Sequence, residues 1–98
     1  MRIWLDDFRE CPLNWHHVKN KVQLEILLNH SIQHNIKVEI ISFDHDLGLG
    51  EPDGYEIIKW MAKEYLHIWP KRIFVHSMNP IGKKNIEEFD KLVREKLL

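Results

Sequence analysis

The chain has 98 residues, of which 44% are apolar and 30% are charged, and this size and composition predict a single domain over residues 1–98. Its 14 Lys and Arg residues nearly balance 15 Asp and Glu residues, so duplex nucleic-acid binding through a general basic surface is not expected. The single cysteine, Cys11, excludes a disulfide framework and indicates a reducing compartment. We expect a cytoplasmic protein without membrane attachment, because the sequence contains no membrane-spanning apolar run and no apolar signal stretch.

The first third of the chain predicts two short strands and a helix. Residues 3–5 form an apolar run that ends at two aspartates, which is typical of a buried strand followed by a functional or capping loop. Residues 15–19 are a candidate second strand. Asn20 and Gln23 have the spacing of a capping box and predict a helix that ends near Asn35. The apolar side chains on one face of that helix are Leu24, Leu27, Leu28 and Ile32.

The rest of the chain predicts two further strands, each followed by a helix. Residues 38–43 are almost continuously apolar, which indicates a strand buried on both faces, and residues 72–75 form another short strand. Asp53 and Glu56 have capping-box spacing at the start of the helix between these strands. The expected core-facing positions are Ile58, Met61, Ala62 and Tyr65 in that helix, and Ile86, Phe89, Val93 and Leu97 in the last helix.

Strands and helices alternate along the chain, which favours parallel strand pairing with right-handed crossovers. The sequence therefore predicts a small α/β sandwich with about four strands and about three helices. In such a sheet, ligands bind beyond the carboxyl ends of the strands. Polar residues follow three predicted strands at that edge: Asp6 and Asp7, then Asp44, His45 and Asp46, and finally His76, Ser77 and Asn79.

Four aspartates at this edge, Asp6, Asp7, Asp44 and Asp46, predict a divalent metal site. Carboxylates brought close together repel one another unless a cation relieves the repulsion. Hard oxygen ligands without a cysteine cluster favour Mg²⁺, Mn²⁺ or Ca²⁺ over a structural zinc, and Mg²⁺ leaves coordination positions for phosphate oxygens. The alternative is that single aspartates only cap turns or helix starts, because Asp is common at such positions.

Two histidines within the polar clusters, His45 and His76, are candidates for proton transfer or metal binding. The ordinary pKa of histidine suits proton transfer near neutral pH. Each also has a structural alternative, in which His76 is a hydrogen-bonded residue at a strand end and His45 orients its loop. The remaining histidines, His16, His17, His30, His34 and His67, are expected at the surface.

Residues near the start of the last helix are candidates for binding phosphate, because free backbone N–H groups and the helix dipole favour an anion there. We expect Ser77, Asn79 and Lys83 to contribute. Arg9 follows the first pair of aspartates closely and could hold a phosphate with its forked guanidinium group. The alternatives are a helix cap for Asn79 and surface ion pairs or solvent for the basic side chains.

Three segments together resemble the cyclic-phosphate-processing receiver-like domain, a divergent relative of the response-regulator receiver. They are Leu5-Asp6-Asp7-Phe8-Arg9 with Pro12, Ser42-Phe43-Asp44-His45-Asp46-Leu47-Gly48, and His76-Ser77-Met78-Asn79-Pro80-Ile81-Gly82. The resemblance covers nearly the whole chain. It implies a flavodoxin-like three-layer sandwich with strand order 2-1-3-4.

The resemblance also implies roles for individual residues. By position, Asp6 and Asp7 resemble the receiver's metal-binding pair, Asp44 its phosphoacceptor, and Ser77 the hydroxyl residue that contacts the phosphoryl group. The sequence departs from a receiver because the fifth strand and the lysine that grips the phosphoryl group are missing. It also adds His45, Asp46 and His76, which shifts the expectation from a phospho-relay switch to hydrolysis.

The leading hypothesis from the sequence is a metal-dependent phosphoesterase that processes a cyclic phosphate on a nucleotide or an RNA end. Asp44, with His45 or His76, would be catalytic, and Asp44 would act either as nucleophile or as a metal ligand. The alternative is a non-catalytic receiver-like module that binds a phosphorylated ligand or a metal for regulation. A third hypothesis is a true receiver that is phosphorylated on Asp44 by a small donor.

Overall fold

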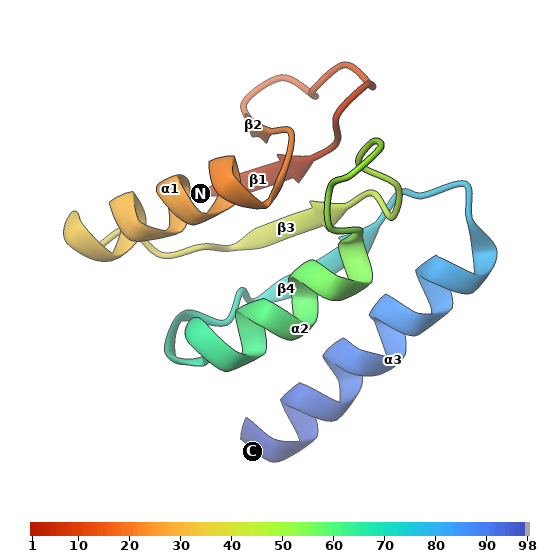
Figure 1. Cartoon of the computed structure of the whole chain (residues 1–98). Helices are drawn as coiled ribbons and strands as arrows, with labels where there is room; N and C mark the ends of the chain where they lie inside the picture. The colour runs from red at the N-terminus through yellow and green to blue at the C-terminus, as the bar shows by residue number, and fades with distance from the viewer. Residues whose placement is uncertain (98) are drawn as a thin grey trace.

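A computed structural model describes residues 1–97 of the chain (Figure 1). The strands are β1 (Arg2–Leu5), β2 (His16–Val18), β3 (Ile40–Phe43) and β4 (Arg72–Val75). The helices are α1 (Lys21–Gln33), α2 (Gly54–Glu64) and α3 (Pro80–Leu97), and a short 3₁₀ helix, η1 (Leu66–Ile68), precedes β4. All strand pairs are parallel and the sheet order is β2-β1-β3-β4. This order confirms the predicted α/β fold with a receiver-like arrangement of strands.

The three helices lie on one side of the sheet (Figure 1). The crossovers β2–α1–β3 and β3–α2–β4 run in the same direction across the sheet, so right-handed connections place α1 and α2 on the same face. The connection from β1 to β2 runs in the opposite direction, but residues 6–15 form a loop there. The opposite face, where the expected third layer would lie, therefore carries no helix among residues 1–97.

Side-chain burial follows this arrangement. Residues such as Ile3, Ile41 and Phe43 face the helices and are fully buried, whereas Trp4 and Phe74 on the other face are partly or largely exposed. The described helices bury most of the predicted core positions: Leu24, Leu28, Ile58, Met61, Tyr65, Ile86 and Val93. None of the helices in residues 1–97 has the length and apolar character needed to cross a membrane.

Two predicted core positions are exposed instead. Ile32 is exposed because the buried stripe of α1 continues from Leu28 to Ser31, three residues on, and turns Ile32 away from the sheet. Leu97 is exposed at the end of α3, which has 18 residues and extends further than α2 with its 11 residues. Both predictions were wrong because helical periodicity identifies a face but not where its neighbours end.

The helix starts agree with the predicted capping residues. Asp53 accepts a hydrogen bond from the Glu56 backbone N–H, and the Glu56 side chain accepts one from the Asp53 N–H, which completes a capping box. At α1, Asn20 accepts from the Gln23 N–H at 2.9 Å. The Gln23 side chain, however, accepts from the Lys19 N–H rather than from the cap residue itself.

Gly54 joins α2 to the end of β3 and leaves no room for a side chain. Its N–H donates to the His45 carbonyl at 2.7 Å, and an added Cβ would overlap the Asp44 carbonyl oxygen. We expect Gly54→Ala to lower the free energy of unfolding by about 3 kcal/mol, because backbone atoms must move. Urea unfolding measures this change. Gly50→Ala is the control, since open space surrounds Gly50 and only its positive φ opposes a side chain.

Candidate functional site

The carboxyl ends of β1, β3 and β4 bring Asp6, Asp44 and His76 side by side. Parallel pairing continues one residue beyond the strands, because the Asp44 N–H donates to the Leu5 carbonyl at 2.9 Å and the His76 N–H donates to the Phe43 carbonyl at 3.0 Å. One ligand atom from each of Asp6, Asp44 and His76 lies within 4.8 Å of the others. Residues from distant parts of the chain therefore form one cluster, which we call the Asp6–Asp44–His76 cluster.

Asp6 is fully buried and its two carboxylate oxygens have different partners. Oδ1 accepts hydrogen bonds from the backbone N–H groups of Phe8 and Arg9, both at 2.8 Å. Oδ2 lies 2.9 Å from His76 Nε2 and accepts its proton. Burial disfavours the charged carboxylate, but these hydrogen bonds outweigh it, so the pKa of Asp6 lies below its ordinary value. Asp6 is therefore a carboxylate fixed in one orientation.

Asp44 lies in an environment that disfavours its charge. Burial and then the negative charge of Asp6 raise the pKa of Asp44, and together they outweigh the hydrogen bond from the His45 N–H and the nearby positive groups. A bound cation would relieve the repulsion between these two carboxylates. The cluster thus fits a divalent ion with oxygen and nitrogen ligands.

His76 is held on three sides. Its Nδ1 lies 2.7 Å from the Ser42 hydroxyl, its Nε2 donates to Asp6, and its ring stacks on Trp4 with centroids 3.7 Å apart and planes 6° from parallel. Burial lowers the pKa of His76 more than the neighbouring carboxylates raise it, which favours the neutral imidazole. With Nε2 protonated toward Asp6, Nδ1 accepts the proton of the Ser42 hydroxyl.

Ser42 and Trp4 were not identified as site residues from the sequence. A signal for Ser42 is present, because it is the polar residue in the otherwise apolar stretch 40–43 and a buried hydroxyl needs a partner. Trp4 offers no comparable signal, since an indole in a short strand is usually a packing residue. The five histidines expected at the surface are exposed: His16, His17, His30, His34 and His67. His17 nevertheless donates from its ring to the Asp6 carbonyl at 2.6 Å.

Ser42→Ala is expected to loosen the His76 ring. Loss of the hydroxyl leaves His76 Nδ1 without this partner and lowers the free energy of unfolding by about 1 kcal/mol. Nitrogen-15 NMR should then show His76 exchanging between its two tautomers. Ser31→Ala is the matched control, because Ser31 is equally buried but donates to the Leu28 carbonyl of its own helix. An unchanged His76 spectrum in Ser42→Ala would contradict the role of Ser42.

A pocket of about 260 Å³ opens above the cluster. It is lined by Asp6, Asp7, Phe8, Arg9, Asp44, Asp46, Ser77, Met78 and Asn79. Asp7 is exposed and lies beside Gly48, where an added Cβ would approach Asp7 Oδ2 to 3.3 Å. Asp46 is also exposed, and its Oδ1 lies 3.3 Å from His45 Nδ1. Of the four aspartates predicted to bind a metal, Asp6 and Asp44 therefore belong to the cluster, while Asp7 and Asp46 line the pocket.

His45 lies behind the pocket, against the first turn of α3. Its ring packs on Gly82, where an added Cβ would overlap the imidazole. The Nε2 atom lies 3.5 Å from Asp53 Oδ2, and Nδ1 faces Asp46. His45 thus contacts the pocket through Asp46 and Asn79, whose Nδ2 lies 3.4 Å from His45 Nδ1, whereas His76 contacts it through Asp6.

The phosphate candidates lie around the same pocket, with one exception. Arg9 lines the pocket and its guanidinium group donates to the His76 carbonyl, which joins the loops after β1 and β4. Ser77 Oγ accepts from the Asn79 N–H at 3.0 Å, so its hydroxyl proton is free to donate. Asn79 Oδ1 accepts from the Gly82 N–H and caps α3. Lys83 is exposed on α3 and lies outside the pocket lining.

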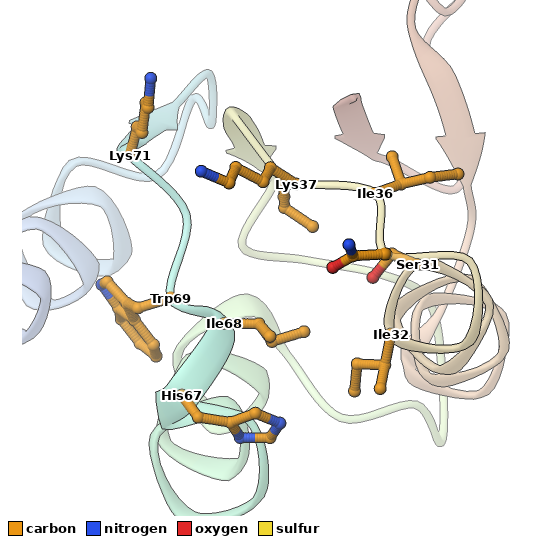
Figure 2. A pocket seen from close by; sticks show the side chains of 10 residues that line it. Ser31, Ile32, Ile36, Lys37, His67, Ile68, Trp69 and Lys71 are labelled. Carbon is orange, nitrogen blue, oxygen red and sulfur yellow. The ribbon is translucent and has the colours of Figure 1, made fainter.

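A second pocket, of about 370 Å³, lies at the opposite end of the sheet (Figure 2). Ile32 and Ile68 point toward each other across it (Figure 2), and Lys37, Trp69 and Lys71 also belong to its lining. Within residues 1–97 its lining contains no carboxylate. It therefore lacks the groups for metal-assisted phosphate chemistry, and the pocket above the cluster remains the candidate site.

Comparison with known proteins agrees with this geometry. The family model described as cyclic-phosphate processing receiver domain matches residues 1–91. No curated protein and no solved structure matches the chain.

Proposed function

The chain belongs to the family of cyclic-phosphate processing receiver domains, and from that premise we propose that it hydrolyses a cyclic phosphate ester on a nucleotide or an RNA end with the help of a divalent metal ion. The observation that carries this proposal is the Asp6–Asp44–His76 cluster, whose two aspartates line a pocket together with Arg9 and Ser77. Hydrolysis consumes one water, breaks one P–O bond of the ring, and leaves a phosphomonoester beside a free hydroxyl group.

The residues that would hold the metal are Asp6, Asp44 and His76, with Asp7 and Asp46 at the pocket side. Asp6 Oδ2 and His76 Nε2 already face each other, and the raised pKa of Asp44 reflects a charge that a cation would relieve. Carboxylate ligands suit Mg²⁺, and the additional imidazole favours Mn²⁺. When bound, such an ion neutralises negative charge on phosphoryl oxygens.

The contact with Ser42 is compatible with His76 acting as a metal ligand. A histidine that binds a metal through Nε2 must carry its proton on Nδ1 and usually donates it to a partner. The Ser42 hydroxyl lies 2.7 Å from Nδ1 and can either donate or accept. The same contact therefore supports the tautomer of the metal-free protein and the tautomer needed for metal binding.

Phosphate oxygens would bind between the loops after β1 and β4. The Arg9 guanidinium is anchored to the His76 carbonyl and still has N–H groups available for a phosphoryl oxygen. The free proton of the Ser77 hydroxyl and the dipole at the start of α3 add further attraction for an anion. Lys83, outside the pocket lining, would contribute only long-range charge.

Proton transfer is assigned to His45 acting through Asp46. Asp46 lines the pocket and lies 3.3 Å from His45 Nδ1, so a proton can pass from the imidazole to the departing ester oxygen through this pair. His76, whose Nδ1 faces Ser42, would instead hold the metal through Nε2, the atom that faces Asp6 in the metal-free protein. Asp44, which lines the pocket, would face the phosphorus and would either orient the attacking water or attack directly.

The proposal is tested by incubating the protein with 2′,3′-cyclic and 3′,5′-cyclic nucleotides in Mg²⁺ or Mn²⁺ and following phosphorus by ³¹P NMR. We expect a phosphomonoester product that does not form in EDTA. A rise in melting temperature without product would instead support a non-catalytic binding module. A base-labile phosphoryl group on Asp44, supplied by a small phosphate donor, would support a true receiver and contradict hydrolysis.

A further inference from the structure

Two large apolar side chains belong to the lining of the otherwise polar pocket. Phe8 is 92% exposed and Met78 is 83% exposed, although both line the same pocket. Single exposed apolar side chains are ordinary on protein surfaces. Here, however, the other lining residues are all polar or charged, namely Asp6, Asp7, Arg9, Asp44, Asp46, Ser77 and Asn79. Phe8 and Met78 are therefore the apolar surface available to a ligand in this pocket.

The loops that carry Phe8 and Met78 are held in place by hydrogen bonds to residues of the site. The Phe8 N–H donates to Asp6 Oδ1 at 2.8 Å, and the Asn79 N–H next to Met78 donates to Ser77 Oγ. The Arg9 guanidinium, which donates to the His76 carbonyl, joins the two loops. Because β3 lies between β1 and β4, the loops that carry Phe8 and Met78 flank Asp44. A ligand bound over Asp44 would have these two side chains at its edges.

An aromatic ring and a thioether suit a flat, polarisable group. Stacking of one nucleobase on an aromatic side chain tightens binding by about tenfold, and methionine sulfur also contacts aromatic rings favourably. A cyclic phosphate on glycerol or a bare sugar presents hydroxyl groups and no flat apolar face. A nucleoside cyclic phosphate presents both the phosphate for the cluster and a base for the apolar side chains.

We infer that Phe8 and Met78 bind the nucleobase of the substrate, so that the substrate class is nucleoside cyclic phosphates and not base-free cyclic phosphates. This inference rests on the proposed function of the same pocket. Stacking uses the face of the base and not its hydrogen-bonding edge, so adenosine and uridine substrates should both bind. The larger purine should bind more tightly.

The test compares adenosine 2′,3′-cyclic phosphate with glycerol 1,2-cyclic phosphate in Mn²⁺, using the full chain. We expect Phe8→Ala and Met78→Ala each to raise KM for the nucleotide about tenfold with little change in kcat, and to leave the glycerol substrate unaffected. Phe8→Trp should retain nucleotide affinity. Leu92→Ala, which removes a 56% exposed leucine outside this pocket on α3, is the control and should change neither substrate. Equal effects of Phe8→Ala on both substrates would overturn the inference.

Calorimetry separates this inference from the proposed function. If neither compound is hydrolysed, the proposed function fails, but adenosine 2′,3′-cyclic phosphate should still bind and Phe8→Ala should weaken its Kd about tenfold. An unchanged Kd in Phe8→Ala, or no binding to the unmodified chain, overturns the inference. Hydrolysis of both compounds with equal kcat/KM also overturns it and leaves the proposed function standing.

Discussion

Asp44→Asn is expected to reduce turnover of a cyclic nucleotide about 10³-fold, because it removes the carboxylate that, in the proposed function, would face both the metal and the phosphorus. It should also abolish the rise in melting temperature that Mn²⁺ produces in the unmodified protein. In EDTA the same variant should melt at a higher temperature than the unmodified chain. The physical reason is that burial and the charge of Asp6 disfavour the Asp44 carboxylate, as its raised pKa shows.

The control for this prediction is Glu51→Gln. It removes a carboxylate from the loop that follows Asp44, but Glu51 is exposed and lies outside the pocket lining. Turnover and metal-dependent melting should be unchanged. Retention of turnover within tenfold in Asp44→Asn would contradict the proposed chemistry, whereas loss of activity in Glu51→Gln would show that net charge matters more than position.

Asp6→Ala is expected to lower the free energy of unfolding by about 3–5 kcal/mol in the absence of metal. Asp6 is fully buried, and its loss leaves the Phe8 and Arg9 N–H groups and His76 Nε2 without their acceptor. These donors are partly buried, and a buried donor without a partner costs about 1–3 kcal/mol, to which the vacated volume adds. Urea unfolding in EDTA measures the effect.

Asp6→Asn separates the loss of charge from the loss of hydrogen bonds. The amide oxygen can still accept from the two backbone N–H groups, so this variant should lose about 1–2 kcal/mol. It should nevertheless lose metal-dependent stabilisation, because a carboxylate ligand is replaced. If Asp6→Ala were as stable as the unmodified chain, the Asp6 hydrogen bonds would not hold the loop after β1.

The predictions for the fold succeeded where the signal was local. The apolar runs of the strands, the caps at Asn20 and Asp53 and most buried helix positions follow from residues a few positions apart. The exposure of Ile32 and Leu97 was not predictable in this way, because it depends on how far neighbouring elements extend. The placement of all three described helices on one face of the sheet was also not predicted, because it depends on the connection over residues 6–15, which contains no helix.

For the site, too, some features could be predicted from the sequence and others depended on the folded structure. The carboxyl ends of parallel strands lie at one edge of a sheet. This rule predicted that residues after β1, β3 and β4 lie close together, and Asp6, Asp44 and His76 do so. The rule does not distinguish Asp6 from Asp7, which are adjacent in the sequence. Asp6 is buried in the cluster because its Oδ1 closes a turn with the Phe8 and Arg9 N–H groups, whereas Asp7 remains exposed.

The order of strands and helices along the chain and the kinds of side chain at the edge of the sheet could be predicted from the sequence, because these depend on periodicity and short-range capping. The contacts between individual side chains could not be predicted in this way: His76 meets Ser42, Trp4 and Asp6, and His45 meets Asp46 and packs against Gly82. These contacts join residues up to 70 positions apart. They depend on sheet register and loop conformation, and the packing of the whole chain fixes both.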